Sequence, residues 1–126
     1  VIACGAMTPA LLEAEVAATQ ALTPKPFGVN LITLHPDLDA LIDVCVRLKV
    51  SHVVLAGGVP SGPSIAKLKA AGIKVMCFTP TLALGKRLVK AGVDAIVIEG
   101  SEAGGHIGPV STSVLAQEIL PVLRDV

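Results

Sequence analysis

Residues 95–108 read AIVIEGSEAGGHIG, an apolar run that breaks into a glycine-rich loop with one histidine. Ile96, Val97 and Ile98 are β-branched and continuous, which is typical of a strand buried under helices on both faces. In parallel α/β folds, ligands bind at the C-terminal ends of the strands, because the loops and the following helices meet there. We therefore expect a ligand site in this loop. Its glycines let the backbone approach a ligand, and His106 is the loop residue best suited to exchange a proton near neutral pH.

The composition describes an apolar chain without excess charge. It has 126 residues, 52% of them hydrophobic, and a formal net charge of zero, which suits a sizeable core. Two Phe and no Trp or Tyr, together with the balanced charge, argue against a nucleic-acid surface. No apolar run approaches the roughly 18 residues of a membrane span, and no basic leader precedes an apolar stretch. We expect a cytoplasmic protein with neither a membrane nor a nucleic-acid partner.

The three cysteines, Cys4, Cys45 and Cys77, are odd in number, far apart and set in apolar patterns. These features predict buried, inert thiols rather than a disulfide framework or a zinc site. We expect no metal.

Five strand–helix pairs follow one another at short, regular intervals. Strands are expected over 1–4, 27–32, 52–56, 73–78 and about 95–98, and each is followed by an amphipathic helix. Thr8, Asp37 and Thr79 are the expected caps of the first, second and fourth helices. The first helix should bury Leu11, Leu12, Val16 and Ala17. Pro121 lies inside the last helical pattern and predicts a kink or an early end.

No linker or charge run separates these units, so residues 1–126 are predicted to form a single domain. The pattern fits either a (β/α) barrel or a doubly wound sheet. A complete barrel needs about 250 residues, so this chain, which opens on a strand without a polar leader, would be roughly half of one and look cut from something longer. The open edges of such a sheet predict self-association into homo-oligomers.

Three segments carry a family resemblance: Phe27–Leu31 (FGVNL), Ala56–Gly58 (AGG) and Glu99–Gly108 (EGSEAGGHIG). Together they resemble the nitronate monooxygenases, formerly called 2-nitropropane dioxygenases, and their sister group, the FMN-dependent enoyl-acyl-carrier-protein reductases. The resemblance covers essentially the whole chain, and its most specific part is the string Glu-Ala-Gly-Gly-His-x-Gly. It implies an α/β fold of the parallel TIM-barrel type that binds FMN, with only about five βα units present.

The resemblance also implies roles for single residues. Asn30, Glu99, Gly104 and Gly105 would contact FMN, and His106 would be the catalytic residue beside a small-molecule substrate. Glu99 departs from the Gln that is common in nitronate monooxygenases, and Glu is common in the reductase group. The family loops that bind the FMN phosphate have no counterpart in this sequence.

The residues alone leave simpler interpretations open. His106 could be a loop histidine that only hydrogen-bonds backbone, and Asn30 a turn residue. Gly57 and Gly58 could form a tight turn, and Glu99 and Glu102 either a carboxylate pair or caps of loop N–H groups. The other histidines, His35 and His52, are expected to be structural or exposed.

The leading hypothesis is an FMN-dependent oxidation of alkyl nitronates by O2, with His106 as base or hydrogen-bond donor. The first alternative is an FMN- and NAD(P)H-dependent enoyl-acyl-carrier-protein reductase. The second is a non-catalytic half-barrel that binds no flavin and pairs its edges with another copy.

Overall fold

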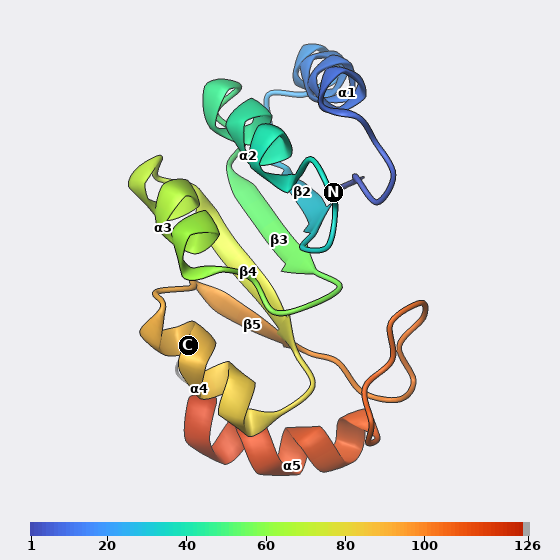
Figure 1. Cartoon of the computed structure of the whole chain (residues 1–126), viewed down its shortest axis with the longest axis vertical. Coiled ribbons are helices and arrows are strands. Elements are labelled where there is room, and N and C mark those ends of the chain that lie inside the picture. The colour runs from blue at the N-terminus through green and yellow to red at the C-terminus, as the bar shows by residue number, and fades with distance from the viewer. Residues whose placement is uncertain (125–126) are drawn as a thin grey trace.

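Five parallel strands lie side by side in the order of the chain, β1-β2-β3-β4-β5, in the computed structural model (Figure 1), which describes residues 1–124. The strands are β1 (Ile2–Ala3), β2 (Gly28–Ile32), β3 (His52–Ala56), β4 (Lys74–Thr79) and β5 (Ala95–Ile98). The helices are α1 (Pro9–Leu22), α2 (Leu38–Arg47), α3 (Gly62–Ala70), α4 (Leu82–Lys90) and α5 (Thr112–Leu123).

The strand order distinguishes the two folds that the sequence left open. A doubly wound sheet reverses its strand order at a switch point and carries helices on both faces. Here each strand is hydrogen-bonded in parallel to the next strand along the chain, from Ile2 beside Val29 to Thr79 beside Ile98. This is the arrangement of successive βα units in a TIM barrel. The predicted fold class, a partial barrel of about five units, is confirmed.

The helices pack on one face of the sheet. Alternate strand residues on that face are fully buried: Val29, Leu31, Val53, Leu55, Val75 and Cys77. They form one core with helix residues that include Leu12, Leu41, Ile42, Ile65, Leu68 and Leu88. On the other face, Val54 is buried, and Asn30, Ile32, Ala56, Met76 and Phe78 are only partly buried. The sheet therefore has one helix-covered face and one open face.

The prediction that residues 95–98 are buried on both faces was wrong. All four residues of β5 are partly exposed. The physical reason is that β5 pairs with β4 alone among the described strands, and only one of its faces meets helices. A β-branched run is typical of burial, but the run does not show how many neighbours the strand has.

Two of the expected helix caps need correction. Asp37 holds the N-cap position of α2 without a side-chain hydrogen bond. Instead, Nδ1 of His35 accepts a hydrogen bond from the Asp37 N–H at 3.0 Å. The cap of α4 is Thr81, whose Oγ1 accepts from the Leu84 N–H, and not Thr79. Thr79 is the last residue of β4, and its hydroxyl donates to the Thr81 carbonyl at 2.7 Å. Thr8 caps α1 as expected, by accepting from the Leu11 N–H at 3.3 Å.

The predicted packing of two helices also differs from the structure. In α1, Leu12 and Val16 are buried, whereas Leu11 and Ala17 are exposed, because residues four apart share one helix face. In α5, the helix continues past Pro121 to Leu123, so the early end was wrong. Leu123 packs so closely on α4 that a Cβ on Gly85 would lie 2.9 Å from its Cδ1. This packing holds the last turn of α5.

The thiols of all three cysteines are free and buried, as predicted. Burial raises the pKa of Cys45 to about 12, and likewise that of Cys77 to about 12. No helix among residues 1–124 has both the length and the apolar character needed to cross a membrane.

Candidate functional site

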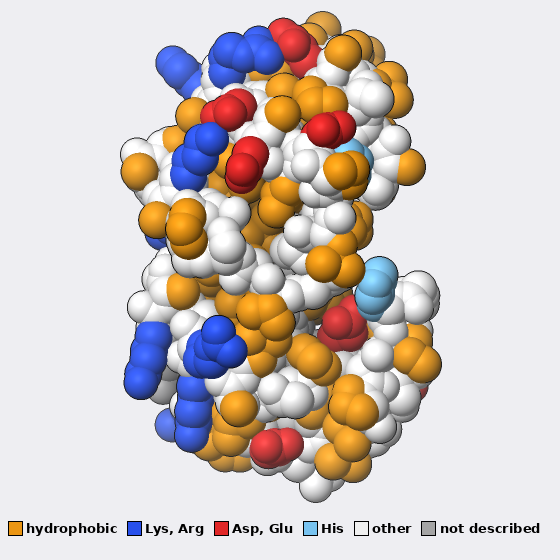
Figure 2. Space-filling model, viewed as in Figure 1, with side chains coloured by type: hydrophobic (Ala, Val, Ile, Leu, Met, Phe, Trp, Pro, Cys, Tyr) orange, Lys and Arg blue, Asp and Glu red, His pale blue; other side chains and the backbone are white. Residues whose placement is uncertain are grey.

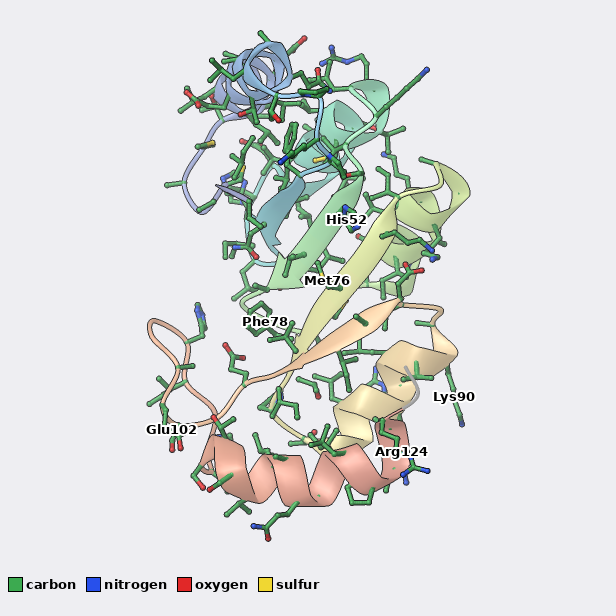
Figure 3. The ribbon with its side chains drawn as sticks, turned by 180° about the vertical axis from the view of Figure 1, so that it is seen from behind. His52, Met76, Phe78, Lys90, Glu102 and Arg124 are labelled. Atoms are coloured by element: carbon green, nitrogen blue, oxygen red, sulfur yellow. The ribbon has the colours of Figure 1, made fainter. Side chains whose placement is uncertain are left out.

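A cavity of about 550 Å³ opens on the helix-free face, at the C-terminal ends of the strands. Its lining combines strand residues with residues of the loop between β5 and α5: Val1, Asn30, Ile32, Val54, Ala56, Gly57, Phe78, Glu99, Ala103, Gly104, Gly105 and His106. Figure 3 shows this face. Phe78 lies near the C-terminal end of β4, and Met76 lies nearer the start of the same strand. The place agrees with the general rule for ligand sites in parallel α/β folds.

The structure brings together the five site residues that the family resemblance implied. Asn30 lies on β2, three strands away from β5, and Glu99 directly follows β5. Gly104, Gly105 and His106 reach the same cavity from the loop. Residues separated by about 75 positions in the chain therefore line one cavity, with a carboxylate, an amide and an imidazole along its wall.

Sequence reasoning missed the apolar part of the lining, Ile32, Val54 and Phe78. These residues alternate with buried residues of the helix-covered face, so a period of two along β2, β3 and β4 would have separated the two faces. That signal was hidden because both faces of these strands are apolar.

The loop that carries His106 is closed at its base by backbone hydrogen bonds. The Gly108 N–H donates to the Gly100 carbonyl at 3.0 Å, and the Ser101 N–H donates to the Val110 carbonyl at 2.7 Å. At this base, which we call the neck of the loop, the two chain segments are so close that a Cβ on Gly108 would overlap the Glu99 carbonyl oxygen. Glycine is therefore required at 108 by the fold of the loop itself.

Glu102 anchors the same loop to α5. Its Oε2 accepts hydrogen bonds from both the N–H and the hydroxyl of Thr112, each at 2.8 Å. The backbone N–H of Thr112, followed by its hydroxyl, holds the pKa of Glu102 below its usual range. Glu102 therefore binds the first residue of α5 rather than N–H groups of its own loop, while Glu99 lines the cavity.

His106 lies against Gly57 of the loop after β3. A Cβ placed on Gly57 would lie 3.1 Å from Ile32 Cγ2 and 3.7 Å from His106 Cε1, and the φ of Gly57 is +74°. The Ala-Gly-Gly segment thus makes a turn and also provides the surface on which the imidazole rests. A side chain at 57 would be strained at this φ and would press on Ile32, while its Cβ would be in ordinary contact with the imidazole.

Gly104 and Gly105 have a different reason to be glycine. A Cβ on either residue would meet no atom within 4 Å, so the packing of the described protein does not exclude a side chain there. Gly105 has a φ of +80°, which favours glycine, whereas Gly104 has no such requirement. Its missing side chain leaves room in the cavity, as a flat ligand lying on the backbone would need.

A second, smaller cavity of about 350 Å³ borders the first. The two share Gly57, Phe78, Glu99 and His106, and the smaller one is otherwise lined by Leu34, Gly58, Val59, Pro80, Leu84, Ile107 and Pro109. Figure 2, which looks from the side opposite to Figure 3, shows a histidine and an acidic side chain close together next to the notch at the right-hand edge of the molecule. His106 therefore lines both cavities.

The remaining histidines lie elsewhere. His52 begins β3, at the opposite end of the strands (Figure 3), and its Nδ1 is 2.8 Å from Ser51 Oγ. His35 accepts the Asp37 N–H described above. Both are structural, as expected. Within the described part of the chain, no group of three or more His, Cys, Asp or Glu side chains is placed to hold a metal ion.

Solved structures with a related fold agree with this description. FabK from Thermotoga maritima superposes with a TM-score of 0.90 at 39% identity, over 94% of this chain and 38% of that one. A nitroalkane oxidase from Streptomyces ansochromogenes gives a TM-score of 0.75 at 27% identity, over 84% of this chain and 40% of that one.

Sequence relatives point to the same group. A protein of Rhodococcus jostii named (3aS,4S,5R,7aS)-5-hydroxy-7a-methyl-1-oxo-octahydro-1H-indene-4-carboxyl-CoA dehydrogenase is 38% identical over 122 residues, which are 95% of this chain and 34% of that protein. A nitronate monooxygenase of Paraburkholderia phytofirmans is 30% identical, over 82% of this chain and 39% of that protein. The chain thus spans between a third and two fifths of the length of these relatives. The sequence profile named nitronate monooxygenase matches residues 37–126, well over half of the chain, and the chain belongs to that family.

Proposed function

We propose that this chain carries the substrate-facing part of a flavin-dependent oxidoreductase that oxidises alkyl nitronates with O2. The observation that carries the proposal is the convergence of His106, Asn30 and Glu99 on one cavity at the strand exits of a barrel-type sheet. The backbone hydrogen bonds at the neck hold the loop that carries His106 in place. The His106 side chain is exposed, so a ligand can reach it.

The lining of the larger cavity suits the ring system of FMN. The Asn30 amide can donate and accept hydrogen bonds along the edge of a ring that alternates donors and acceptors. The backbone at Gly104 leaves room for a flat face, and Phe78 and Val54 provide apolar contact. When bound, FMN would supply the electron-transfer chemistry. Neither Lys nor Arg is among the lining residues, so this wall offers no cationic partner to a phosphate.

His106 would act on the substrate. It is exposed and borders both cavities, so a substrate held over the flavin ring lies within its reach. Its imidazole would take the proton from the carbon of a neutral nitroalkane, or hydrogen-bond the nitro oxygens of a nitronate. Glu99, on the same wall, would fix the polar edge of the ligand.

The test measures O2 consumption by the FMN-loaded protein on a nitroalkane and on its nitronate. The change His106→Asn should lower kcat with the neutral nitroalkane by about 10²-fold or more, the usual contribution of a general base. The flavin content should be unchanged, and His52→Asn, at the far end of the strands, should keep the parent rate. Equal rates for the parent and His106→Asn would exclude His106 as the base.

A second candidate is the reduction of an enoyl thioester by NAD(P)H through FMN. Two observations favour it: FabK is 39% identical over 94% of this chain, and position 99 is Glu rather than Gln. The carboxyl-CoA dehydrogenase, at 38% identity, is also named for a CoA compound. NADH oxidation that depends on an enoyl thioester, without O2 uptake on a nitronate, would assign the protein to this reaction.

A further inference from the structure

We propose that a cavity at the N-terminal ends of β2 and β3 binds a phosphate group, carried either by inorganic phosphate or by a phosphate monoester. The cavity has a volume of about 280 Å³ and is lined by residues 23–27 and 49–51 together with Gln20. The two segments connect α1 to β2 and α2 to β3, at the end of the strands that His52 marks in Figure 3. This N-terminal cavity is therefore at the opposite end of the sheet from His106, and the proposal does not depend on the proposed function.

The lining of the N-terminal cavity carries unbalanced positive charge. Among the described residues, Lys25 and Lys49 are its only charged ones, and no carboxylate lines it. Neither ammonium group forms an ion pair or a hydrogen bond within residues 1–124, whereas Lys67, Lys69 and Lys74 are each paired with an aspartate. The C-terminal ends of α1 and α2 each bring about half a negative charge to this end of the sheet. Two full positive charges exceed these two half charges, so an anion would complete the charge balance.

Hydrogen-bond donors are available in the same lining. Thr23 Oγ1 accepts the Lys25 N–H at 3.2 Å, and none of the described residues accepts its hydroxyl proton. Gln20 Nε2 donates one of its two protons to the Leu48 carbonyl at 2.9 Å and keeps the other. Each ammonium group adds three donors. A phosphate group, with a charge of about −1.5 to −2 at pH 7 and three acceptor oxygens, suits two cations and several donors better than a carboxylate does.

Lys49 occupies a backbone position that favours glycine. It is the only described residue other than glycine with a positive φ, +53°. It ends α2 with the same backbone hydrogen bonds with which Gly72 ends α3 and Gly92 ends α4. A lysine after a helix can bind the last carbonyls, but here the Leu48 carbonyl accepts from Gln20 instead. The turn therefore does not explain a lysine at 49, and a ligand for its ammonium group does.

The remaining walls of the N-terminal cavity leave room beside the phosphate group. A water molecule takes up about 30 Å³ in the liquid, so a cavity of about 280 Å³ holds a phosphate group and a small organic part. Phe27 lines this space, and Pro24 and Pro26 restrict the backbone on both sides of Lys25. The base of the Lys25 side chain is thus placed before a ligand binds.

The first experiment titrates inorganic phosphate, and in a parallel series methyl phosphate, into the protein at constant ionic strength, with chloride as the balancing anion. Amide shifts followed by NMR should concentrate at Lys25, Lys49 and Ser51 and leave residues 99–108 unchanged. Tighter binding of methyl phosphate would identify a monoester as the ligand, and tighter binding of inorganic phosphate would identify the free ion. Equal shifts with chloride or succinate, or no shift at millimolar phosphate, would overturn the proposal.

The second experiment uses Lys49→Gly, which removes the charge and relieves the backbone. Its midpoint temperature of unfolding without phosphate should be above that of the parent, because glycine suits the positive φ. The rise in this temperature that phosphate produces in the parent should be lost. A phosphate response retained in Lys49→Gly would overturn the proposal.

Matched lysine variants separate the site from general charge effects. Lys25→Gln should weaken phosphate binding by about five-fold or more, a modest effect because the group is exposed. Lys86→Gln, at an exposed position on α4, should keep the parent affinity. Equal losses in Lys25→Gln and Lys86→Gln would show attraction by the overall charge and would overturn the proposal.

Discussion

Asp94 joins the turn before β5 to the neighbouring strand and helix. Its carboxylate accepts hydrogen bonds from Lys69 Nζ at 2.6 Å, Lys74 Nζ at 3.1 Å and the Val75 N–H at 2.8 Å. Burial opposes its ionisation, but these donors outweigh burial and lower its pKa from 3.8 to about 2. The ionised carboxylate is therefore part of the folded structure.

We expect Asp94→Asn to lower the free energy of unfolding at pH 7 by about 1 kcal/mol, a value reduced for the solvent contact of the pair with Lys69. Because the folded-state pKa is below the unfolded one, this stabilisation is present above about pH 4 and is lost as the pH falls toward 2. Urea unfolding at pH 7 and at pH 3 should show the difference between parent and variant shrinking in acid. Glu15→Gln, on the surface of α1, is the control, and a difference independent of pH would contradict the assignment.

Single residues could be predicted where one physical rule fixed their place. His106 was expected at a ligand site because ligands bind at the C-terminal ends of parallel strands. Asn30 and Glu99 were expected there from the family resemblance. Phe78 was not expected there, because apolar residues on the open face look the same in the sequence as those under the helices. Asp94 was not singled out at all, since nothing local to it shows that Lys69 lies nearby.

At the scale of elements, the loop between β5 and α5 depends on its anchor. Glu102→Gln removes the charge that binds both donors of Thr112. We expect faster hydrogen exchange of the Thr112 amide and faster proteolysis between 103 and 109, with Glu118→Gln on the same helix as the control. Because folding lowers the pKa of Glu102, its stabilising effect is fully present at pH values above the ordinary pKa of Glu. The effect is lost as the pH falls through the lowered pKa. Equal hydrogen exchange of the Thr112 amide in the parent and the variant would contradict this expectation. It would show that the backbone hydrogen bonds at the neck hold the loop without Glu102.

The helices and strands themselves were predictable from periodicity and stop signals, such as the glycines at 72 and 92 with positive φ. The residues that cap the helices were harder to predict. Thr79 and Thr81 both precede an apolar helical pattern, and only the length of β4 decides between them. The strand length depends on pairing with β3 and β5, which no local pattern records.

At the scale of the whole molecule, the chain would provide one wall of the proposed flavin site. Because the lining offers a ring surface without Lys or Arg, we expect FMN and riboflavin to bind with dissociation constants within about three-fold of each other. A phosphate held by charged groups would favour FMN by about ten-fold or more. Flavin fluorescence titrations on the same preparation compare the two, and Asn30→Ala should weaken both alike. A strong preference for FMN would require a phosphate site within reach of this wall.

The choice between barrel and doubly wound sheet could not be made from the residue pattern, because both folds use the same strands, helices and loop glycines. What differs is the side of the sheet on which each helix packs, which is a property of the assembled sheet. The family resemblance favoured the barrel, and the strand order decided it.

The strand order also has a consequence for how the chain folds. Each strand pairs only with the strands next to it in sequence among the described elements, so every closure spans a single βα unit. The entropy losses on closing these units are similar, because the units have similar lengths. Structure can therefore spread from β3 toward both ends, unit by unit, as in a linear repeat. Among the described strands, β1 and β5 each pair with one neighbour only, so we expect their amides to exchange with solvent faster than those of the central strand β3.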